Sequence, residues 1–484
     1  MTDLLATYWP LFLAAADLLG AVMASLHALL KKRETHSVIG WVGLIWLAPF
    51  IGWLLYFCFG INRIQRRGCE VSQKLQAVLQ QIRIPVPETV LQKIEEVKTE
   101  HLQFKQINET VEKLTHRPLL PKNNIQPLIN GDQAYPAMLQ AIADAQKSIS
   151  LVSYIFDNDR AGQPFIEALE QAHRRGVQVR VLIDGVGARY SRPSSVRELQ
   201  KRGVPCHTFL PTLVPRFTAY ANLRNHRKIM VVDGTTGFTG GMNIREGCLL
   251  DQPSKHPVQD LHFRFSGPVV THLQEAFLTD WAFTTGEILQ GETWLPIPPF
   301  DGQVLARGIT DGPDEDFERL LMTILAAISI ARQRVVIVTP YFLPDPTMIR
   351  ALTLAVLRGV EVDIMVPRKN NIRLVQWASS HPLKQVMEGG CNVYCTEPPF
   401  DHSKLLLVDD AWCLVGSTNL DPRSLRLNFE FNVECYSPEL VADLWEIVQV
   451  KRKRATHLQV QDLTGRHVAL RLRDGIARLM TPYL

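Results

Sequence analysis

The segment HRKIMVVDGTTGFTGGMN at residues 226–243 returns, with the same spacing, as HSKLLLVDDAWCLVGSTN at residues 402–419. In both copies Lys follows His by two residues and Asp follows Lys by five, and Gly and Asn then follow Asp by seven and ten. A single His, Lys and Asp at fixed spacing arises by chance in roughly a few per cent of chains this long. Two matching copies therefore indicate a duplicated unit. No Cys/His quartet with metal-ligand spacing surrounds either copy, so the pattern does not favour a zinc site.

The sequence around each copy repeats as well. A buried strand, a helical pattern ending in Arg-Gly-Val and another buried strand occur in each half, and the glycine suits a helix C-cap. The predicted strands are at residues 149–156, 178–184, 335–342 and 361–367, and the predicted helices at 165–175 and 348–358. A repeat about 180 residues long is far longer than a solenoid repeat and fits a duplicated domain. We expect an α/β sandwich with mixed, largely parallel sheets and halves packed face to face.

Two apolar segments near the N-terminus, residues 9–30 and 38–60, are each long enough to cross a hydrocarbon core of about 30 Å. They predict an α-helical membrane hairpin. Basic residues follow both segments, so either the short loop escapes the positive-inside rule or one segment is shallow or re-entrant. Asp17 is costly inside a span and should face a partner, a headgroup or water.

The net charge of +4 is too small to indicate a general nucleic-acid binder. The charge is uneven, because residues 451–484 contain eight Lys or Arg and two Asp, a net charge of +6. A basic tail predicts an anionic surface as partner. Apolar residues at 468, 472, 476 and 479 fall near one helical face among arginines, which indicates an interfacial helix or a surface helix of the body. Residues 213–220 mix aromatic and basic side chains, and either contact headgroups or form a packed loop.

The predicted domain organisation has five parts. These are a membrane hairpin at residues 1–62, a linker or arm at 63–125, a first α/β domain at 126–300, a second at 301–450, and a basic amphipathic tail at 451–484.

The motif residues indicate chemistry at phosphorus. Side chains two apart on a strand share a face, so His226 lies with Lys228, and His402 with Lys404. The motif aspartates have the opposite parity, which suits a turn at the strand end better than contact with their own histidines. A histidine nucleophile needs a carboxylate to hold its ring. Downstream candidates are Asp260 after the first copy, and Glu430 or Glu434 after the second.

These groups suit phosphoryl transfer without a metal, a nucleotide or any other cofactor. One neutral histidine attacks the phosphorus of a diester, lysines and asparagines hold the phosphoryl oxygens, and the opposite histidine protonates the leaving alkoxide. Neither half holds a complete set, so both copies should meet in one pocket. The candidate residues are His226, Lys228, Asp233, His402, Lys404 and Asp409 (catalytic), Asn243, Ser417 and Asn419 (phosphate-binding), and Asp260 and Glu430 (orienting the histidines).

The paired motifs resemble the signature of the phospholipase D superfamily, known for its two HKD motifs. The chain is similar over nearly its whole length to bacterial cardiolipin synthases of the phospholipase D type. This similarity includes the hairpin, the turn that begins Tyr341-Phe342, the stretch Pro367-Arg-Lys-Asn370, and the stretch at residues 419–425. The resemblance implies two phospholipase D-like domains related by a pseudo-two-fold axis. One departure is Gly241 where the second copy has Ser417, so backbone groups are expected to contact phosphate there.

The resemblance also implies a function. A membrane-bound transferase of phospholipid biosynthesis would condense two phosphatidylglycerols to cardiolipin and glycerol through a phosphohistidine, with His226 as nucleophile. It implies anionic phospholipids as partners, no nucleic acid, and a multi-pass protein of the bacterial inner membrane with its catalytic body on the cytoplasmic face; a homo-oligomer is left open. The alternatives are a phospholipase D hydrolase, a transferase making another phospholipid, an endonuclease, and a non-catalytic lipid-binding scaffold.

Overall fold

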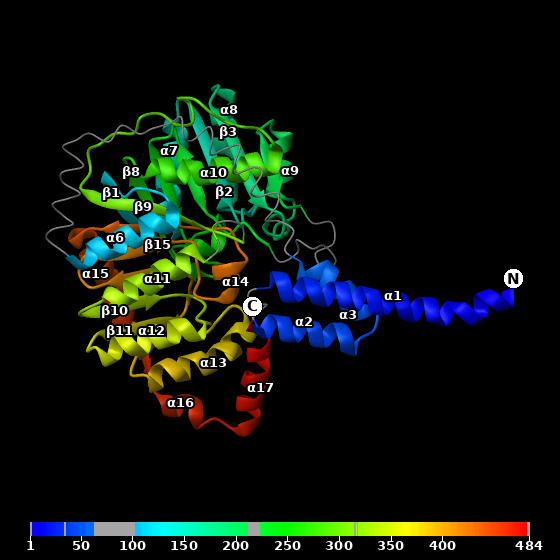
Figure 1. The fold of residues 1–484 in the computed structure, drawn as a ribbon. Coiled ribbons are helices and arrows are strands. Elements are labelled where there is room, and N and C mark those ends of the chain that lie inside the picture. The colour runs from blue at the N-terminus through cyan, green and yellow to red at the C-terminus, as the bar shows by residue number, and fades with distance from the viewer. Residues whose placement is uncertain are drawn as a thin grey trace. The chain divides into compact units, whose positions relative to one another are not determined.

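The computed structural model describes residues 2–32, 35–61, 102–211, 223–313, 316 and 318–481 (Figure 1). The chain divides into two compact units, Met1–Arg67 with Thr212–Asn222, and Gly68–Pro211 with Leu223–Leu484. We call the second unit the body. The predicted headgroup contact at residues 213–220, and residues 63–101 of the predicted arm, lie outside the described residues.

The N-terminal unit begins with one long apolar helix, α1 (Thr2–Lys31). Within it, residues 8–31 are long and apolar enough to cross a membrane. The second apolar segment is not one continuous helix: it comprises α2 (Thr35–Leu47), α3 (Ile51–Leu55) and a π-helical turn, Tyr56–Gly60. At 1.5 Å per residue the 13 residues of α2 extend about 20 Å. The expectation that both segments are long enough to span therefore holds for α1, whereas a break divides the second segment.

Asp17 holds the backbone at this break. Its Oδ1 accepts hydrogen bonds from the backbone N–H of Phe50 (2.6 Å) and from Nε1 of Trp53 (2.9 Å). Pro49 follows α2, and Phe50 has a left-handed φ of 59°. Of the three alternatives for Asp17, a partner, a headgroup or water, the structure shows a partner: the turn between α2 and α3.

The body contains a 15-stranded mixed sheet. Its strands are β1 (Leu120–Ile129), β2 (Ser148–Ser153), β3 (Gln178–Asp184), β4 (Cys206–Phe209), β5 (Ile229–Val232), β6 (Thr236–Gly240), β8 (Leu261–Ser266), β9 (Val304–Asp311), β10 (Arg334–Val338), β11 (Glu361–Pro367), β12 (Asn392–Thr396), β14 (Leu405–Val408), β15 (Trp412–Gly416), β16 (Glu430–Tyr436) and β17 (Thr456–Leu458). A separate two-stranded sheet pairs β7 (Val258–Gln259) with β13 (Phe400–Asp401).

The strand order shows the duplication. It runs β17-β12-β11-β10-β14-β15-β16-β9-β1-β8-β6-β5-β2-β3-β4, so each half has the same order outward from the β9–β1 junction, and β17 is an addition. The βαβ units predicted around residues 149–184 and 335–367 are confirmed as β2-α8-β3 and β10-α12-β11. The glycines after the two helices, Gly176 and Gly359, have φ values of 91° and 88°, as C-caps require.

Two expectations about the sheets need correction. The parallel pairings are β2 with β3 and β3 with β4 in the first half, and β10 with β11 and β11 with β12 in the second. The motif strands β5 and β14 instead form antiparallel hairpins with β6 and β15, and most pairings in the sheet are antiparallel. The halves are also not simply packed face to face. Because β1 pairs with both β8 and β9, the sheet runs from one half into the other.

Helices cover both faces of the sheet (Figure 1). Those of the first half are α7 (Asn130–Asp144), α8 (Gly162–Arg174), α9 (Ser195–Lys201) and α10 (Val270–Thr285). Those of the second half are α11 (Arg319–Ile330), α12 (Pro346–Leu357), α13 (Arg373–Glu388), α14 (Pro422–Arg426) and α15 (Pro438–Arg454), followed by α16 (Val460–Thr464) and α17 (Val468–Leu479). Short 3₁₀ turns occur at Gly187–Arg189 and Glu246–Cys248.

Parts of the predicted arm and tail belong to the body. Helix α6 (Leu102–Thr115) buries Phe104, Ile107 and Val111 in the apolar core of the second half. Strand β17 of the tail pairs with β12 and extends the sheet. Both segments therefore contribute to the core or the sheet of the second half.

Candidate active site

Each motif histidine lies three residues before a buried strand, β5 or β14, whose residues are all apolar and buried. The backbone here pairs with the opposite half. His226 N–H donates to the carbonyl of Phe429 (2.9 Å), and His402 N–H donates to that of Gln259 (2.8 Å). Phe429 and Gln259 directly precede Glu430 and Asp260. This pairing therefore brings an acid from each half beside the histidine of the other half.

The histidine–acid pairs are crossed between the halves. Nδ1 of His226 lies 2.9 Å from Oε1 of Glu430, and Nδ1 of His402 lies 2.8 Å from Oδ2 of Asp260. The sequence suggested both acids but not which histidine each would contact. The alternative acid, Glu434, instead forms an ion pair with the fully buried Arg307 at 2.5 Å. In both pairs the acid holds Nδ1, which leaves Nε2 as the reactive nitrogen.

The motif lysines lie against their own histidines. Lys228 Nζ donates to the backbone carbonyl of His226 (2.5 Å), and Lys404 Nζ donates to that of His402. Burial lowers the pKa of Lys228 to about 7 and that of Lys404 to about 8, although the nearby Glu430 and Asp260 oppose the shift. Both ammonium groups are thus poorly solvated cations that an entering anion would stabilise.

The two histidine–acid pairs differ in protonation. Burial lowers the pKa of His226 well below its usual value, and the lysines add to this shift; the pKa of His402 is also lowered by burial, but Asp260 opposes the change. Burial raises the pKa of Glu430 to about 7. Burial also disfavours ionised Asp260, yet Lys404 and His402 outweigh it and hold the Asp260 pKa below its usual range. His402 therefore faces an ionised carboxylate, and His226 one that is partly protonated near neutral pH.

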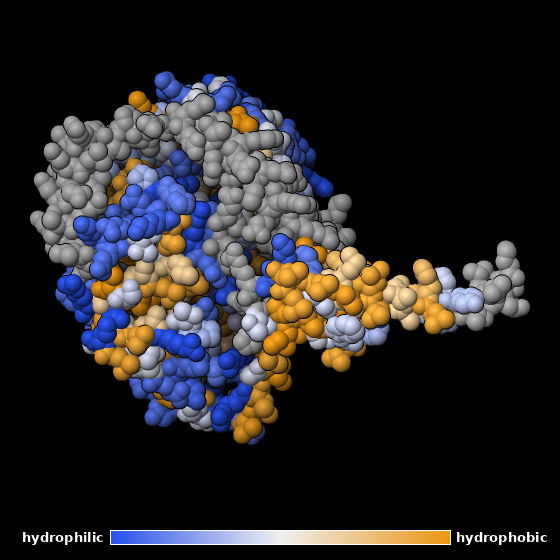
Figure 2. Space-filling model, viewed as in Figure 1, coloured by the Kyte–Doolittle hydropathy of each residue, from blue (hydrophilic) through white to orange (hydrophobic). Residues whose placement is uncertain are grey.

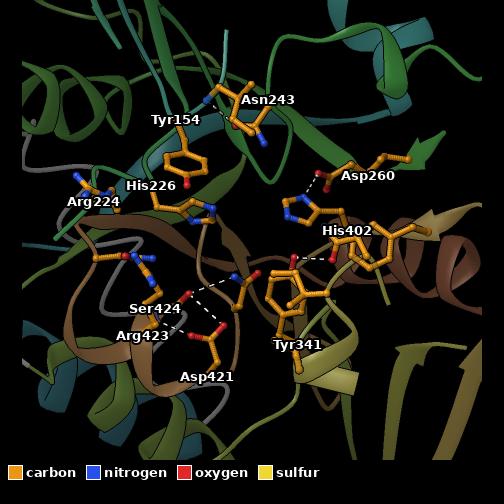
Figure 3. A pocket seen from close by; sticks show the side chains of 18 of the residues that line it. Tyr154, Arg224, His226, Asn243, Asp260, Tyr341, His402, Asp421, Arg423 and Ser424 are labelled. Atoms are coloured by element: carbon orange, nitrogen blue, oxygen red, sulfur yellow. Dashed lines mark hydrogen bonds and ion pairs between the residues drawn. The ribbon is translucent and has the colours of Figure 1, made fainter. Parts of the chain in front are cut away.

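A cavity of about 470 Å³ contains both histidines (Figure 3). The two rings face each other across it, each contributed by a different half. The predicted site residues that line it are His226, Asn243, Asp260, His402 and Asn419. The expectation of one shared pocket agrees with this arrangement.

The predicted phosphate-binding residues differ in their positions. Asn243 and Asn419 line the cavity. Asn243 Oδ1 accepts from the backbone N–H of Ile155 (3.1 Å), so its Nδ2 remains as the donor. Asn419 Nδ2 donates to Ser424 Oγ at 3.2 Å. Ser417 is fully buried, does not line the cavity, and donates its hydroxyl to Glu430. This geometry holds the acid rather than a phosphate.

Gly241 takes the place of Ser417 in the first half, and it does not present its backbone to the cavity as expected. Its N–H donates to the Leu261 carbonyl at 3.1 Å. A β-carbon at this position would lie 2.3 Å from Asp260 Oδ1. The glycine therefore gives the Asp260 carboxylate room to reach His402.

The motif aspartates bind the backbone at strand-end turns. Asp233 accepts from the N–H groups of Gln146, Lys147 and Ser148 at 2.7–3.2 Å. Asp409 accepts from three consecutive N–H groups, those of residues 332–334, at 2.8–3.1 Å. Both have left-handed φ values, 51° and 52°. Neither lines the cavity, so the geometry supports the role of structural anchor that their strand parity suggested.

Several cavity residues were not among the sequence candidates. The ring centroid of Tyr154 lies 5.1 Å from that of His226, and Tyr341 lies 6.4 Å from His402. Burial raises the pKa of both phenols, so they remain hydroxyl donors. Arg224 and Arg423 also line the cavity. Tyr341 begins one of the turns that the chain shares with the family, and Arg423 lies in the shared stretch at residues 419–425. The family resemblance could therefore have pointed to these two residues.

The class of protein follows from the fold and from comparison with known families. The family model "Cardiolipin synthase, PLD-like domain" matches residues 138–281 and 324–450, and a "Phospholipase_D-nuclease N-terminal" model matches residues 19–60. A phosphatidylserine synthase structure from Haemophilus influenzae has a TM-score of 0.61 at 17% identity, covering 78% of this chain and 100% of that one, which shows the shared fold. The chain is an enzyme of the phospholipase D superfamily, and the expected fold class is confirmed.

Curated relatives narrow the assignment. "Cardiolipin synthase 2" of Staphylococcus epidermidis is 30% identical over 479 residues, covering 98% of both chains. "Cardiolipin synthase A" of Pseudomonas putida is 33% identical over 478 residues, covering 98% of this chain and 97% of that one. The chain belongs to the cardiolipin synthase family with phospholipase D-like domains.

Proposed function

We propose that this protein condenses two phosphatidylglycerol molecules to cardiolipin and glycerol by way of a phosphohistidine. The observation that carries the proposal is the crossed pair of histidines in one cavity, each held at Nδ1 by an acid of the other half. Two such histidines provide a nucleophile and a separate proton carrier. Membership of the cardiolipin synthase family supports phosphatidylglycerol as the substrate.

The first half-reaction forms the covalent intermediate. Nε2 of neutral His226 attacks the phosphorus of one phosphatidylglycerol, and the bond from phosphorus to the glycerol oxygen breaks. His402 gives its proton to this oxygen, so glycerol leaves as the neutral alcohol. Lys228, Lys404 and the amide of Asn243 stabilise the negative charge on the phosphoryl oxygens.

The second half-reaction reverses these roles. A hydroxyl of the second phosphatidylglycerol gives its proton to His402 and attacks the phosphorus, and the bond to His226 breaks. One phosphodiester replaces another, so no external energy source is needed. Two in-line displacements predict retention of configuration at phosphorus.

The difference between the two pairs supports His226 as the nucleophile. A nucleophile must be neutral, and the pKa of His226 is lowered well below its usual value by burial and by the lysines. Burial and Lys404 also lower the pKa of His402, but the ionised Asp260 opposes this shift, so His402 keeps a proton to a higher pH than His226 and is the better general acid of the two. The structural asymmetry thus agrees with the assignment that the family resemblance implied.

The proposed location is the bacterial inner membrane, with the body on the cytoplasmic face. Helix α1 is long and apolar enough to span. The broken second segment, held by Asp17, suits a re-entrant hairpin in place of a second complete crossing. A multi-pass topology stays a prediction that accessibility labelling on both sides of the membrane would test.

The deciding experiment uses purified full-length protein in phosphatidylglycerol vesicles without nucleotide. We expect cardiolipin and glycerol in equal amounts, and protein denatured in detergent at neutral to mildly alkaline pH, where the N–P bond survives, should retain label from phosphatidylglycerol radiolabelled in its phosphate. Peptide mapping should place this label on His226; a label on His402 would reverse the assigned roles. Phosphatidic acid as the only lipid product would show a hydrolase instead.

A further inference from the structure

A second cavity of about 410 Å³ adjoins the active-site cavity. The two share lining residues, among them Val258 and Phe400, which are paired directly across β7 and β13. The Phe400 ring centroid lies 5.9 Å from that of His402. This second cavity, which we call the annex, therefore opens on the side of the histidine that carries the proton.

The lining of the annex is basic. Lys255 lies in the loop before β7, Lys369 in the loop after β11, and Arg245 at the boundary with the active-site cavity. Arg245 forms an ion pair with Asp157 at 3.3 Å. Within the described ranges neither Lys255 nor Lys369 has an ion-pair partner. Glu397, the carboxylate closest in sequence to the annex loops, is engaged by Arg368.

We propose that the annex binds the phosphate of the acceptor alcohol, with Lys255 and Lys369 as its cationic contacts. This inference rests on the proposed function, because it names the acceptor site of the same reaction. The attacking hydroxyl must meet His402, and the three-carbon glycerol unit of the acceptor separates its phosphate from that hydroxyl, so the phosphate lies beside the histidine and not at it. An anionic alcohol bound this way is selected over water and over neutral alcohols, because these carry no negative charge for Lys255 and Lys369 to bind.

The test compares acceptors while the donor stays the same. Phosphatidylglycerol vesicles are given either no other acceptor or a neutral one, ethanol, and cardiolipin, phosphatidylethanol and phosphatidic acid are quantified together. In the variant Lys255→Gln/Lys369→Gln we expect cardiolipin formation to fall roughly ten-fold. Phosphatidylethanol formation should stay unchanged, because the first half-reaction and a neutral acceptor do not use the annex.

Controls separate the possible causes. Lys255→Arg/Lys369→Arg should retain cardiolipin formation, and Lys201→Gln, an exposed lysine at the end of α9, should match the unmodified protein. An equal fall in cardiolipin and phosphatidylethanol in the Gln variant would overturn the annex. Absence of cardiolipin from the unmodified protein, with phosphatidylethanol still formed, would instead overturn the proposed function.

Glycerol phosphate serves as a third acceptor, because it has the same charge without acyl chains. If the unmodified protein uses glycerol phosphate inefficiently, the acceptor in the annex is a membrane lipid. Efficient use, lost in the Gln variant, assigns the annex to a soluble phosphate ester and overturns the lipid as its occupant.

The C-terminal helix α17 carries a second, independent inference. Its Asp474 and Ala477 are buried against α13, and Arg473 lies over the Trp377 ring at 4.5 Å. The apolar side chains on the opposite face point outward (Figure 2). They are Val468, Leu472, Ile476 and Leu479, which are 62%, 63%, 67% and 75% exposed. Helical spacing puts these four residues in one stripe.

We infer that this stripe inserts into the surface of an anionic bilayer. The exposed Arg471 and Arg478 flank it and have no ion pair within the part of the chain that the structure describes. An apolar stripe flanked by arginines matches acyl chains below anionic headgroups. Val375 of α13, which belongs to the same apolar cluster as Ala477, lines the active-site cavity. Docking of α17 would therefore bring the wall of this cavity close to the lipid substrate.

The test uses Ile476→Cys in the full-length protein, labelled with an environment-sensitive fluorophore and reconstituted in nanodiscs. With phosphatidylglycerol we expect a blue shift and quenching by acyl-chain spin labels; Lys201→Cys, labelled in the same way, should show neither. The Arg471→Gln/Arg478→Gln variant should weaken both signals. A blue shift that appears only in nanodiscs holding two copies, without quenching by the lipid spin labels, would identify a second copy of this chain as the occupant and overturn the inference.

Discussion

The two halves of the body share strand order and motif spacing, but they equip the active site differently. The first half contributes His226, with Gly241 beside the acid Asp260, whereas the second contributes His402, with Ser417 bonded to the acid Glu430. Because the acids cross between the halves, each histidine is tuned by the opposite copy. The duplication gives two similar half-sites, and in the proposed mechanism small differences near the acids distinguish the nucleophile from the proton carrier.

Symmetry in the backbone therefore permits asymmetry in protonation. Glu430, with a pKa raised to about 7 by burial, does not reliably hold a charge opposite His226. Asp260, beside Lys404 and His402, stays ionised. A neutral nucleophile and a protonated general acid are what the proposed transfer requires.

The largest expected effect comes from removing either histidine. His226→Ala and His402→Ala should each lower cardiolipin formation by at least about 10⁴-fold, because members of one catalytic unit are not additive. Only His402→Ala should still accumulate a trapped phosphoenzyme from a substrate whose leaving group needs no proton, such as a p-nitrophenyl phosphodiester. Retained activity in either variant would indicate a lipid-binding scaffold.

Replacing the acids should cause the next largest loss and should separate the two halves. Asp260→Asn removes an ionised partner of His402, so we expect a fall of roughly 10²–10⁴-fold in kcat/KM. Glu430→Gln replaces a group already partly protonated near pH 7, so its loss should be smaller, roughly ten-fold to a hundred-fold. Steady-state kinetics at pH 7 measure both. Equal losses would remove the proposed asymmetry.

The residues beside the acids give a smaller effect. Gly241→Ser would place its β-carbon 2.3 Å from Asp260 Oδ1, so the acid must move from His402. We expect a loss of roughly ten- to a hundred-fold. Ser417→Gly removes one hydrogen bond to Glu430 and should cost less than ten-fold. The kinetics of both variants test whether a side chain at position 241 displaces the Asp260 carboxylate. Unchanged activity of Gly241→Ser would contradict this.

Local patterns predicted much of this fold. The motif spacing, the buried strands and the Arg-Gly-Val endings of two helices specify short-range structure, and they correctly placed β2-α8-β3 and β10-α12-β11. Strand parity favoured a turn role for the motif aspartates over contact with their own histidines, and the hydrogen bonds of both aspartates to backbone N–H groups agree with this. The offset of Asp260 and Glu430 from the motifs, together with the family resemblance, made them candidates.

Longer-range features were beyond the sequence. The crossing of the acids depends on backbone pairing between Gln259 and His402, which lie far apart in the chain. The role of Ser417 in holding Glu430 depends on which way one hydroxyl points. The break in the second apolar segment, where Asp17 accepts from Phe50 N–H, was not located by composition, which showed only that the segment is long enough to span and left a re-entrant course open. Tertiary partners decided each of these cases.

The motif aspartates should affect stability more than catalysis. Asp233→Ala leaves three backbone N–H groups without their acceptor, and we expect unfolding to become easier by about 2–3 kcal/mol. Asp409→Ala should cost more, because Asp409 is buried and Asp233 is half-buried. The Asn variants tolerate the left-handed φ and should retain more stability. Thermal unfolding measures this, while activity well below the transition should fall by less than about ten-fold; a catalytic role would predict inactive but stable protein.

The smallest effect concerns pH and again compares the halves. The lowered pKa values, about 7 for Lys228 and about 8 for Lys404, mean that both lysines lose charge as pH rises through 7–9, well below the usual lysine range. The free enzyme then binds the phosphate less well, so kcat/KM should decrease on the alkaline side. Arginine stays protonated there, so Lys228→Arg should shift the alkaline limb upward more than Lys404→Arg, because Lys228 titrates first. Each shift should change kcat/KM at pH 9, relative to pH 7, by a few-fold. If neither substitution moves the alkaline decrease of kcat/KM, another group causes it. The two lysines would then differ in their positions and not in their charge near neutral pH.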